Sequence, residues 1–234
     1  MSNLLNPFRM APPGGGGGLT LESEGRLINT SAPGVTPTIL TSVTMTAGDM
    51  LIIVMDTCRN TGGSAMTISG TWNGEALTVS ENILHAGGRI TAHILTLVAA
   101  SSGTFSPVIT CSNSAAAVGA YFYVVSGQSG SPIKQTKKAS LTSSAGPVQT
   151  TIVAPNTGAF IFATGSIRFA TGGATLMNAD SPLTEDDTFA TGAGNNLDLA
   201  FGAGHMTAPS TSDITIGFTP DATQNLLIAA VEIF

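Results

Sequence analysis

The sequence predicts an all-β protein, a two-layer antiparallel β-sandwich of jelly-roll type built from two similar halves. Short apolar or alternating runs recur along the chain, and clusters of Gly, Pro, Asn and Ser separate them. Charged residues make up 9% of the chain, against roughly 25% in typical soluble domains. The surface must therefore consist largely of Thr, Ser, Asn, Gly and Ala, which favours strands and turns over exposed helices.

The turn signals divide the chain into short expected strands. The clearest signal is Asn73-Gly74, because both residues can take the positive φ angles of a type I′ turn and so close a hairpin. One helical turn is expected within 112–119. The expected strands are 39–45, 50–57, 66–72, 75–79, 89–98, 106–112, 119–126, 148–153, 159–166, 174–177, 196–202, 213–218 and 226–233.

An internal repeat organises the larger part of the chain. The stretch 44–55 aligns with 152–163, and 107–126 aligns with 213–232 in the same order. We infer one β-sandwich domain over 19–234, made of halves at about 27–126 and 139–234, and we expect the halves to interleave. Two tandem sandwiches of about 100 residues are the alternative.

Residues 1–18 differ in texture from this domain and are expected to be an N-terminal anchor peptide followed by a glycine-rich hinge. Glycine lacks Cβ and loses much freedom on folding, so a run of it behaves as a flexible joint. The apolar stub before it is too short to fold alone and is costly to leave in water, so it should bind a partner. The expected anchor residues are Leu4, Leu5, Pro7, Phe8 and Met10, and the expected hinge residues are Gly14, Gly15, Gly16, Gly17 and Gly18.

Charge and hydropathy exclude several classes of partner. The formal net charge of −6 argues against nucleic acid, which requires a basic face. The small basic cluster of Lys134, Lys137 and Lys138 is expected to be a solvated loop. No apolar run approaches the roughly 20 residues of a membrane-spanning helix. Asn6 and Pro7 interrupt the stub, so no signal peptide is expected and synthesis should be cytoplasmic.

The two cysteines, Cys58 and Cys111, lack the spacing of a zinc site. They are expected to be buried small residues in a reducing compartment, and a single disulfide is the alternative. The histidines are scattered at positions 85, 93 and 205. No metal site and no cofactor are therefore expected.

Catalytic motifs of hydrolases, metalloproteases and nucleotide-binding enzymes are missing from the sequence. The stretch 178–188 concentrates Asp180, Glu185, Asp186 and Asp187. Without a calcium-binding register, a solvated acidic loop is the expected structure. A glycosidase would need two carboxylates facing each other across a cleft. Trp72 could stack on a sugar, but core packing explains a single tryptophan more economically.

Four stretches carry a resemblance to a known module: "GDMLIIV" (48–54), "TWNGEALT" (71–78), "ITAHILTLVAASSGT" (90–104) and "GAYFYVVSGQSGSPI" (119–133). Together they resemble a β-sandwich module of tailed-bacteriophage virion proteins of the head-spike, decoration or tail-fibre type. The resemblance covers roughly 35–234, and the N-terminal stub with its glycines is similar to the start of phage fibre and spike proteins. The second half has "MNADSPLT" in place of the Trp-Asn-Gly hairpin.

The resemblance implies a non-enzymatic phage structural protein on the virion surface, as a capsid decoration, head spike or turret, or tail fibre. No catalytic residues belong to the module, so none are assigned. Residues 1–13 would bind other virion proteins of the capsid or tail. The sandwich would assemble as a homo-oligomer, which we expect to be a trimer because cyclic symmetry closes its contacts. A carbohydrate-binding or adhesin module for host surface glycans, with Trp72 as the contact, is the alternative.

Overall fold

The computed structural model describes residues 18–59, 63–168, 176–191, 199–221 and 223–234. These residues form strands and turns, and none of them lies in a helix that could cross a membrane. The strands of the first half are β1 (Thr20–Gly34), β2 (Val43–Met45), β3 (Met50–Cys58), β4 (Ile68–Trp72), β5 (Glu75–Ala76), β6 (Thr78–Leu84), β7 (Ile90–Val98), β8 (Gly103–Phe105), β9 (Val108–Cys111) and β10 (Ala115–Ser126). Those of the second half are β11 (Ile133–Ser144), β12 (Val148–Ile152), β13 (Phe160–Arg168), β14 (Met177–Ala179), β15 (Thr184–Ala190), β16 (Leu199–Thr207), β17 (Ile214–Pro220) and β18 (Gln224–Ile233).

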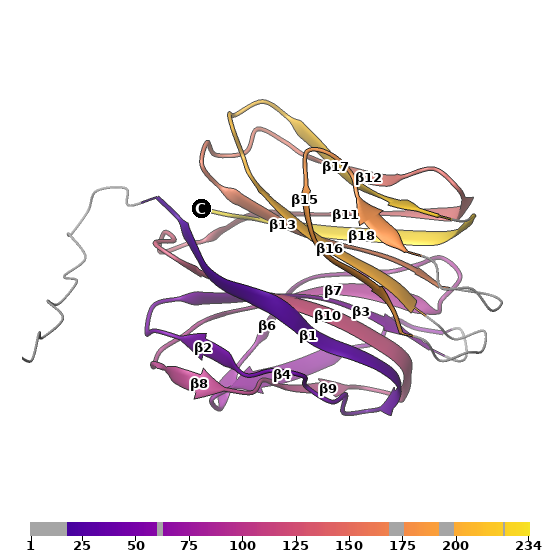
Figure 1. Cartoon of the computed structure of the whole chain (residues 1–234), viewed down its shortest axis with the longest axis horizontal. Helices are drawn as coiled ribbons and strands as arrows, with labels where there is room; N and C mark the ends of the chain where they lie inside the picture. Colours follow the sequence, from indigo (N-terminus) through magenta and orange to yellow (C-terminus); the bar gives the residue numbers. More distant parts are fainter. Residues whose placement is uncertain (1–17, 60–62, 169–175, 192–198, 222) are drawn as a thin grey trace, which may run out of the picture.

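Each half contains one five-stranded antiparallel sheet, and the two sheets have the same strand order. The first is β1-β10-β3-β7-β6 and the second is β11-β18-β13-β16-β15. Small sheets cover their outer faces, β2-β8 and β5-β4-β9 on the first half and β12-β17-β14 on the second. Figure 1 shows the halves stacked, with the indigo-to-magenta strands below and the orange-to-yellow strands above. The prediction of an all-β antiparallel fold built from two similar halves is confirmed.

The expectation that the halves interleave is wrong. Every sheet in the described part of the chain takes its strands from one half only, so each half is a two-layer sandwich of its own, as in the tandem alternative. In each half the last strand, β10 or β18, pairs with the first strand and with the long strand that starts the core. Pairing within a half closes shorter loops than pairing across halves, which costs less chain entropy.

Three layers of apolar side chains separate the sheets. One lies inside each half and the third lies between the two five-stranded sheets. On β3, Leu51, Ile53 and Met55 point into the first half, whereas Ile52 and Val54 point toward the second half. Because both faces of this strand are buried, its sequence is apolar without interruption from Met50 to Met55 and does not alternate.

Matching turns define which residues of the two halves are equivalent. The amide of Gly48 donates to the carbonyl of Ala99 at 2.8 Å, and the amide of Gly158 donates to the carbonyl of Ala208 at 2.9 Å. Both glycines have positive φ, 94° and 84°, a conformation that favours glycine. They start β3 and β13 in the same way, so β3 and β13 are counterparts.

The five-stranded sheets stack reciprocally. β1 lies against β15 and β6 lies against β11, while β3 lies against β13. By strand order, β11 is the counterpart of β1, and β15 is the counterpart of β6. The two halves are therefore related by an approximate two-fold rotation, as the subunits of a symmetric dimer are.

Two further expectations need correction. The helical turn expected within 112–119 is wrong, because β10 begins at Ala115 and is held on both sides by β1 and β3. The halves also begin earlier than expected, at Thr20 and Ile133, since each starts with a polar edge strand. Cys58 and Cys111 are free and buried, and they lie in different apolar layers.

Candidate functional site: a charged seam between the halves

The residues expected to form the anchor and most of the hinge, 1–13 and 14–17, lie outside the described residues. Gly18 is exposed, and β1 begins two residues later at Thr20. The folded body therefore begins directly after the glycine run.

Trp72 is fully buried and is not a glycan contact. Its indole Nε1 donates to the carbonyl oxygen of Val43 at 3.1 Å, and its ring meets that of Phe105 edge-to-face with centroids 5.3 Å apart. The indole thus has its polar group satisfied and its ring inside the first half. Core packing, the more economical of the two interpretations of Trp72, is therefore its role, and the buried ring offers no face to a sugar.

The acidic stretch 178–188 is not the solvated loop that was expected. Its second part forms β15, an edge strand of the second five-stranded sheet that lies against β1. The side chain of Asp186 is 3% exposed and that of Asp187 is 14% exposed. Earlier in the stretch, Asp180 accepts a hydrogen bond from the hydroxyl of Thr219 at 2.7 Å. These carboxylates are therefore structural contacts.

Asp186 and Asp187 take part in a cluster that we call the charged seam, where β15 and β16 of the second half meet β1 and β10 of the first. Its residues are Glu24, Arg26, Tyr123, Asp186, Asp187 and His205.

Arg26 and Asp187 form a bidentate ion pair across the seam. Nε of Arg26 donates to Oδ2 at 2.7 Å and Nη2 donates to Oδ1 at 2.6 Å. The guanidinium also lies over the ring of Phe189, 4.3 Å from its centroid. A paired and stacked guanidinium of this kind is stronger than a single-point ion pair.

Asp186 binds groups from both halves. The hydroxyl of Tyr123 donates to Oδ2 at 2.6 Å, and Nδ1 of His205 lies 2.8 Å from both carboxylate oxygens. Oε2 of Glu24 lies 3.9 Å from the same His205 nitrogen. The hydrogen bond with Asp186 raises the pKa of His205, while burial and the charge of Asp186 raise the pKa of Glu24.

Aromatic side chains surround the His205 ring. The rings of Phe160, Phe162 and Tyr123 have centroids 6.3, 6.2 and 5.9 Å from it. The imidazole side chain is 19% exposed. Its orientation is thus restricted by packing as well as by Asp186.

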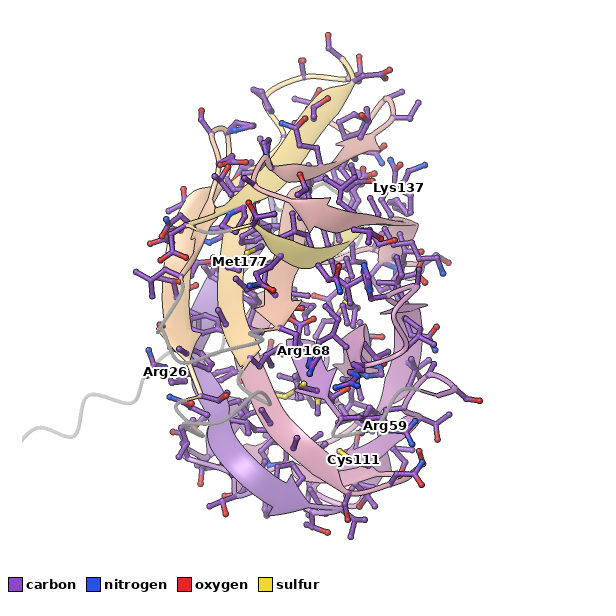
Figure 2. The ribbon with its side chains drawn as sticks, turned by 90° about the vertical axis from the view of Figure 1, so that its right-hand side faces the viewer. Arg26, Arg59, Cys111, Lys137, Arg168 and Met177 are labelled. Atoms are coloured by element: carbon purple, nitrogen blue, oxygen red, sulfur yellow. The ribbon has the colours of Figure 1, made fainter. Side chains whose placement is uncertain are left out.

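The pseudo-symmetric position on the opposite side of the molecule is a second seam, where β6 and β7 meet β11. Lys138 Nζ lies 2.8 Å from Oε1 of Glu81, and the Thr136 hydroxyl donates to Oε2 of Glu81 at 2.8 Å. The hydroxyls of Ser80 and Thr96 are 2.7 Å apart. We call this group the hydroxyl seam. Figure 2 shows Arg26 and Lys137, the neighbour of Lys138, on opposite sides of the molecule.

Strand registers make the two seams equivalent residue by residue. Thr96 pairs with Thr78 at the start of β6, and His205 pairs with Thr184 at the start of β15. Both edge strands then have a register shift at the same place, directly before Glu81 and Asp187. Counted in this way, the counterparts of Glu24, Arg26, Asp186, Asp187 and His205 are Thr136, Lys138, Ser80, Glu81 and Thr96.

A buried polar contact lies between the seams. Asp56 of β3 is fully buried, and its Oδ2 accepts a hydrogen bond from the hydroxyl of Thr164 on β13. Burial raises the pKa of Asp56 to about 7, and the hydroxyls of Thr164 and Ser166 oppose this rise. Asp56 is thus a carboxyl group inside the contact between the halves that stays protonated to a much higher pH than an exposed aspartate.

The other histidines are structural. His93 is fully buried in the first half, and burial lowers its pKa to about 3. Nδ1 of His85 accepts a hydrogen bond from the amide of Gly87 at 2.9 Å, and its Nε2 lies 3.0 Å from the carbonyl of Leu141. His205 differs from these two histidines, because it converges with two carboxylates. Sequence reasoning missed Glu24 and His205, since neither is part of a motif.

Comparisons with known proteins find one distant structural likeness and no matching family. No family model and no curated protein matches the chain. Among solved structures, the chain is similar to the major capsid protein P2 from bacteriophage PM2, with 11% identity over 91% of this chain and 98% of that chain. The TM-score is 0.24, and a likeness at this level supports no argument about fold or function.

Proposed function

We propose that this chain is a non-enzymatic structural protein displayed on the surface of a phage virion, held there by residues 1–13. One observation supports the proposal most strongly. The glycine run ends at Gly18, and the first strand of the double sandwich, β1, begins two residues later at Thr20. Five glycines span about 12 Å as a random coil, so the body would project from the particle surface. The resemblance of 35–234 to virion sandwich modules supports the same function.

The use of the polar residues supports a structural role over catalysis. Asp186, Asp187 and Glu81 each bind a group of the opposite half, so these carboxylates hold the molecule together. A glycosidase needs two carboxylates free to face a sugar across a cleft. The alternative of a glycan-binding module rested on Trp72, and the burial of this residue removes that support.

We also propose that copies of the chain assemble with one another, as a trimer. Apolar side chains are exposed on the outer side of the first half, on or beside β8 and β9. They are Val35, Phe105 and Val108, with exposed fractions of 38–54%. A contact between copies would bury them without removing charges from water.

The test is attachment to particles. Phage are produced with the full chain, with residues 2–13 deleted, or with Leu4, Leu5, Phe8 and Met10 changed to Ser as the matched control for length. We expect antibody labelling of intact virions by the full chain only, with both variants folded and soluble. Light scattering of the purified full chain should give the trimer mass. Normal occupancy of the truncated chain on virions would overturn the anchoring proposal.

A further inference from the structure

We propose that Glu24, Asp186 and His205 of the charged seam form a binding site for one divalent transition-metal ion, with Zn²⁺ as the best fit. The site joins β1 of the first half to β15 and β16 of the second, so the ion would cross-link the halves. This inference does not depend on the virion assignment, because it concerns side chains within the folded body.

The geometry is close to that of a three-ligand site. One ligand atom from each residue lies within 4.8 Å of the other two. Nδ1 of His205 is 2.8 Å from Asp186 and 3.9 Å from Glu24. Bonds of 2.0–2.2 Å in a tetrahedron place neighbouring ligand atoms about 3.4 Å apart, a value between the two. Small side-chain rotations and loss of the Nδ1 proton of His205 would therefore admit the ion.

The surroundings of the ligands also fit a metal site. The hydroxyl of Tyr123 donates to Oδ2 of Asp186, which orients the carboxylate and leaves Oδ1 available. Such hydrogen bonds to a ligand are a usual part of protein metal sites. The side chain of Glu24 is 34% exposed, so an ion can enter from its side, and water can complete the coordination there.

The hydroxyl seam shows that the fold itself does not require this cluster. At the equivalent positions stand Thr136, Ser80 and Thr96, and the hydroxyls of Ser80 and Thr96 bind each other at 2.7 Å. At these three positions the same strands, in the same register, thus carry neutral hydroxyl groups on one side of the molecule. On the other side, an imidazole and two carboxylates converge at positions where hydroxyl groups are sufficient for the fold.

The donor set indicates the class of ion. One imidazole nitrogen with carboxylate oxygens suits Zn²⁺ and related transition ions, whereas Ca²⁺ and Mg²⁺ prefer shells of oxygen ligands. We therefore expect Zn²⁺ to bind with at least tenfold higher affinity than Mg²⁺ or Ca²⁺.

The experiment is calorimetric titration of ZnCl₂ into the full chain after treatment with EDTA and dialysis, together with melting curves. We expect one Zn²⁺ per chain and a melting temperature that rises with Zn²⁺ until saturation. His205→Gln and Asp186→Asn should abolish binding, and Glu24→Gln should weaken it at least tenfold. Thr96→Val, at the position equivalent to His205, should leave binding unchanged, and so should His85→Gln.

Circular dichroism establishes that each variant is folded, and Glu24→Gln, at the most exposed ligand, keeps the test valid if Asp186→Asn does not fold. The proposal is overturned if the folded wild-type chain binds no Zn²⁺, or if the affinity for Zn²⁺ is unchanged in Glu24→Gln or in His205→Gln. Loss of binding in His85→Gln alone would overturn it too, since that would locate the ion elsewhere. Equal affinity for Mg²⁺ would contradict the assigned class.

Discussion

Arg26 and Lys138 occupy equivalent positions in the two halves, and each forms an ion pair with the equivalent acidic residue of the opposite half. Arg26 binds Asp187, and Lys138 binds Glu81. This reciprocity is the rule of a two-fold symmetric dimer interface, in which residue i contacts j and j contacts i. Here it holds within one chain, so the contact between the halves follows the design of a dimer.

The two ion pairs should differ in strength. Arg26 binds through two hydrogen bonds and stacks on Phe189, whereas Lys138 is 47% exposed and binds as a point charge. We expect double-mutant cycles in urea unfolding to give about 1–2 kcal/mol for Arg26–Asp187 and about 0.2–1 kcal/mol for Lys138–Glu81. Arg26→Lys should recover less than half of the coupling, because lysine lacks the planar fork. Equal coupling in the two pairs would contradict this account.

Gly119 should be a point of close approach between the halves. A Cβ at this position would lie 2.9 Å from Cβ of Phe201, across the contact between β10 and β16. Gly119→Ala is therefore expected to destabilise the chain by about 1–3 kcal/mol through overpacking. Gly130→Ala is the matched control, since nothing lies within 4 Å of a Cβ there. Urea unfolding measures both, and a neutral Gly119→Ala would show that the sheets separate easily.

Within the two five-stranded sheets, sequence patterns predicted the central strands well and the edge strands poorly. The strands expected at 50–57 and 226–233 are close to β3 and β18, which lie inside the five-stranded sheets and are buried along most of their length. β1, β11 and β15 were missed, and all three are edges. Edge strands carry charged and polar residues that discourage pairing with other chains, so the signal that marks a buried strand is absent from them.

The candidate site was missed for the same reason. Glu24 and Asp186 lie on missed edge strands, 162 positions apart as their numbers show. Asp186 meets His205 because β15 pairs with β16, and Glu24 meets them only because one sheet stacks on the other. The repeat could be found in the sequence, but its alignment fixed the order of elements and did not show how the halves face each other. Strands that are buried on both faces are recognised in a sequence only by their hydrophobicity. No further pattern in the sequence shows which strands of the two sheets face each other.

Trp72→Ala should act through stability alone. The indole is fully buried and hydrogen-bonded to Val43, so truncation leaves a large cavity and an unpaired carbonyl. We expect a loss of about 3–5 kcal/mol in urea unfolding, and a smaller loss for Trp72→Phe. Phe105→Ala, at the exposed end of the same edge-to-face pair, should cost less than half as much. A Trp72→Ala chain of normal stability would contradict the burial of this residue.

Asp56 should make stability depend on pH. Burial raises its pKa from 3.8 to about 7, so between these values the folded chain holds a proton that the unfolded chain has lost. Folding then takes up a proton, and the contribution of Asp56 to stability falls as pH rises from about 4 to 7. The shift of about three units corresponds to a fall on the order of 4 kcal/mol. Above pH 7 both states are ionised and the contribution is constant.

Asp56→Asn isolates this contribution from those of other titrating groups. The amide cannot ionise, yet it keeps the shape of the carboxyl group and can accept the hydrogen bond from the hydroxyl of Thr164. The free energies of unfolding of wild type and variant, measured in urea from pH 4 to pH 8, should differ by an amount that changes with pH in the variant's favour. At pH 8 we expect the variant to be more stable, because the wild type must bury a charge between its sheets. Parallel curves would show that Asp56 has the same pKa in both states, and the carboxylate would then have to be solvated within the contact.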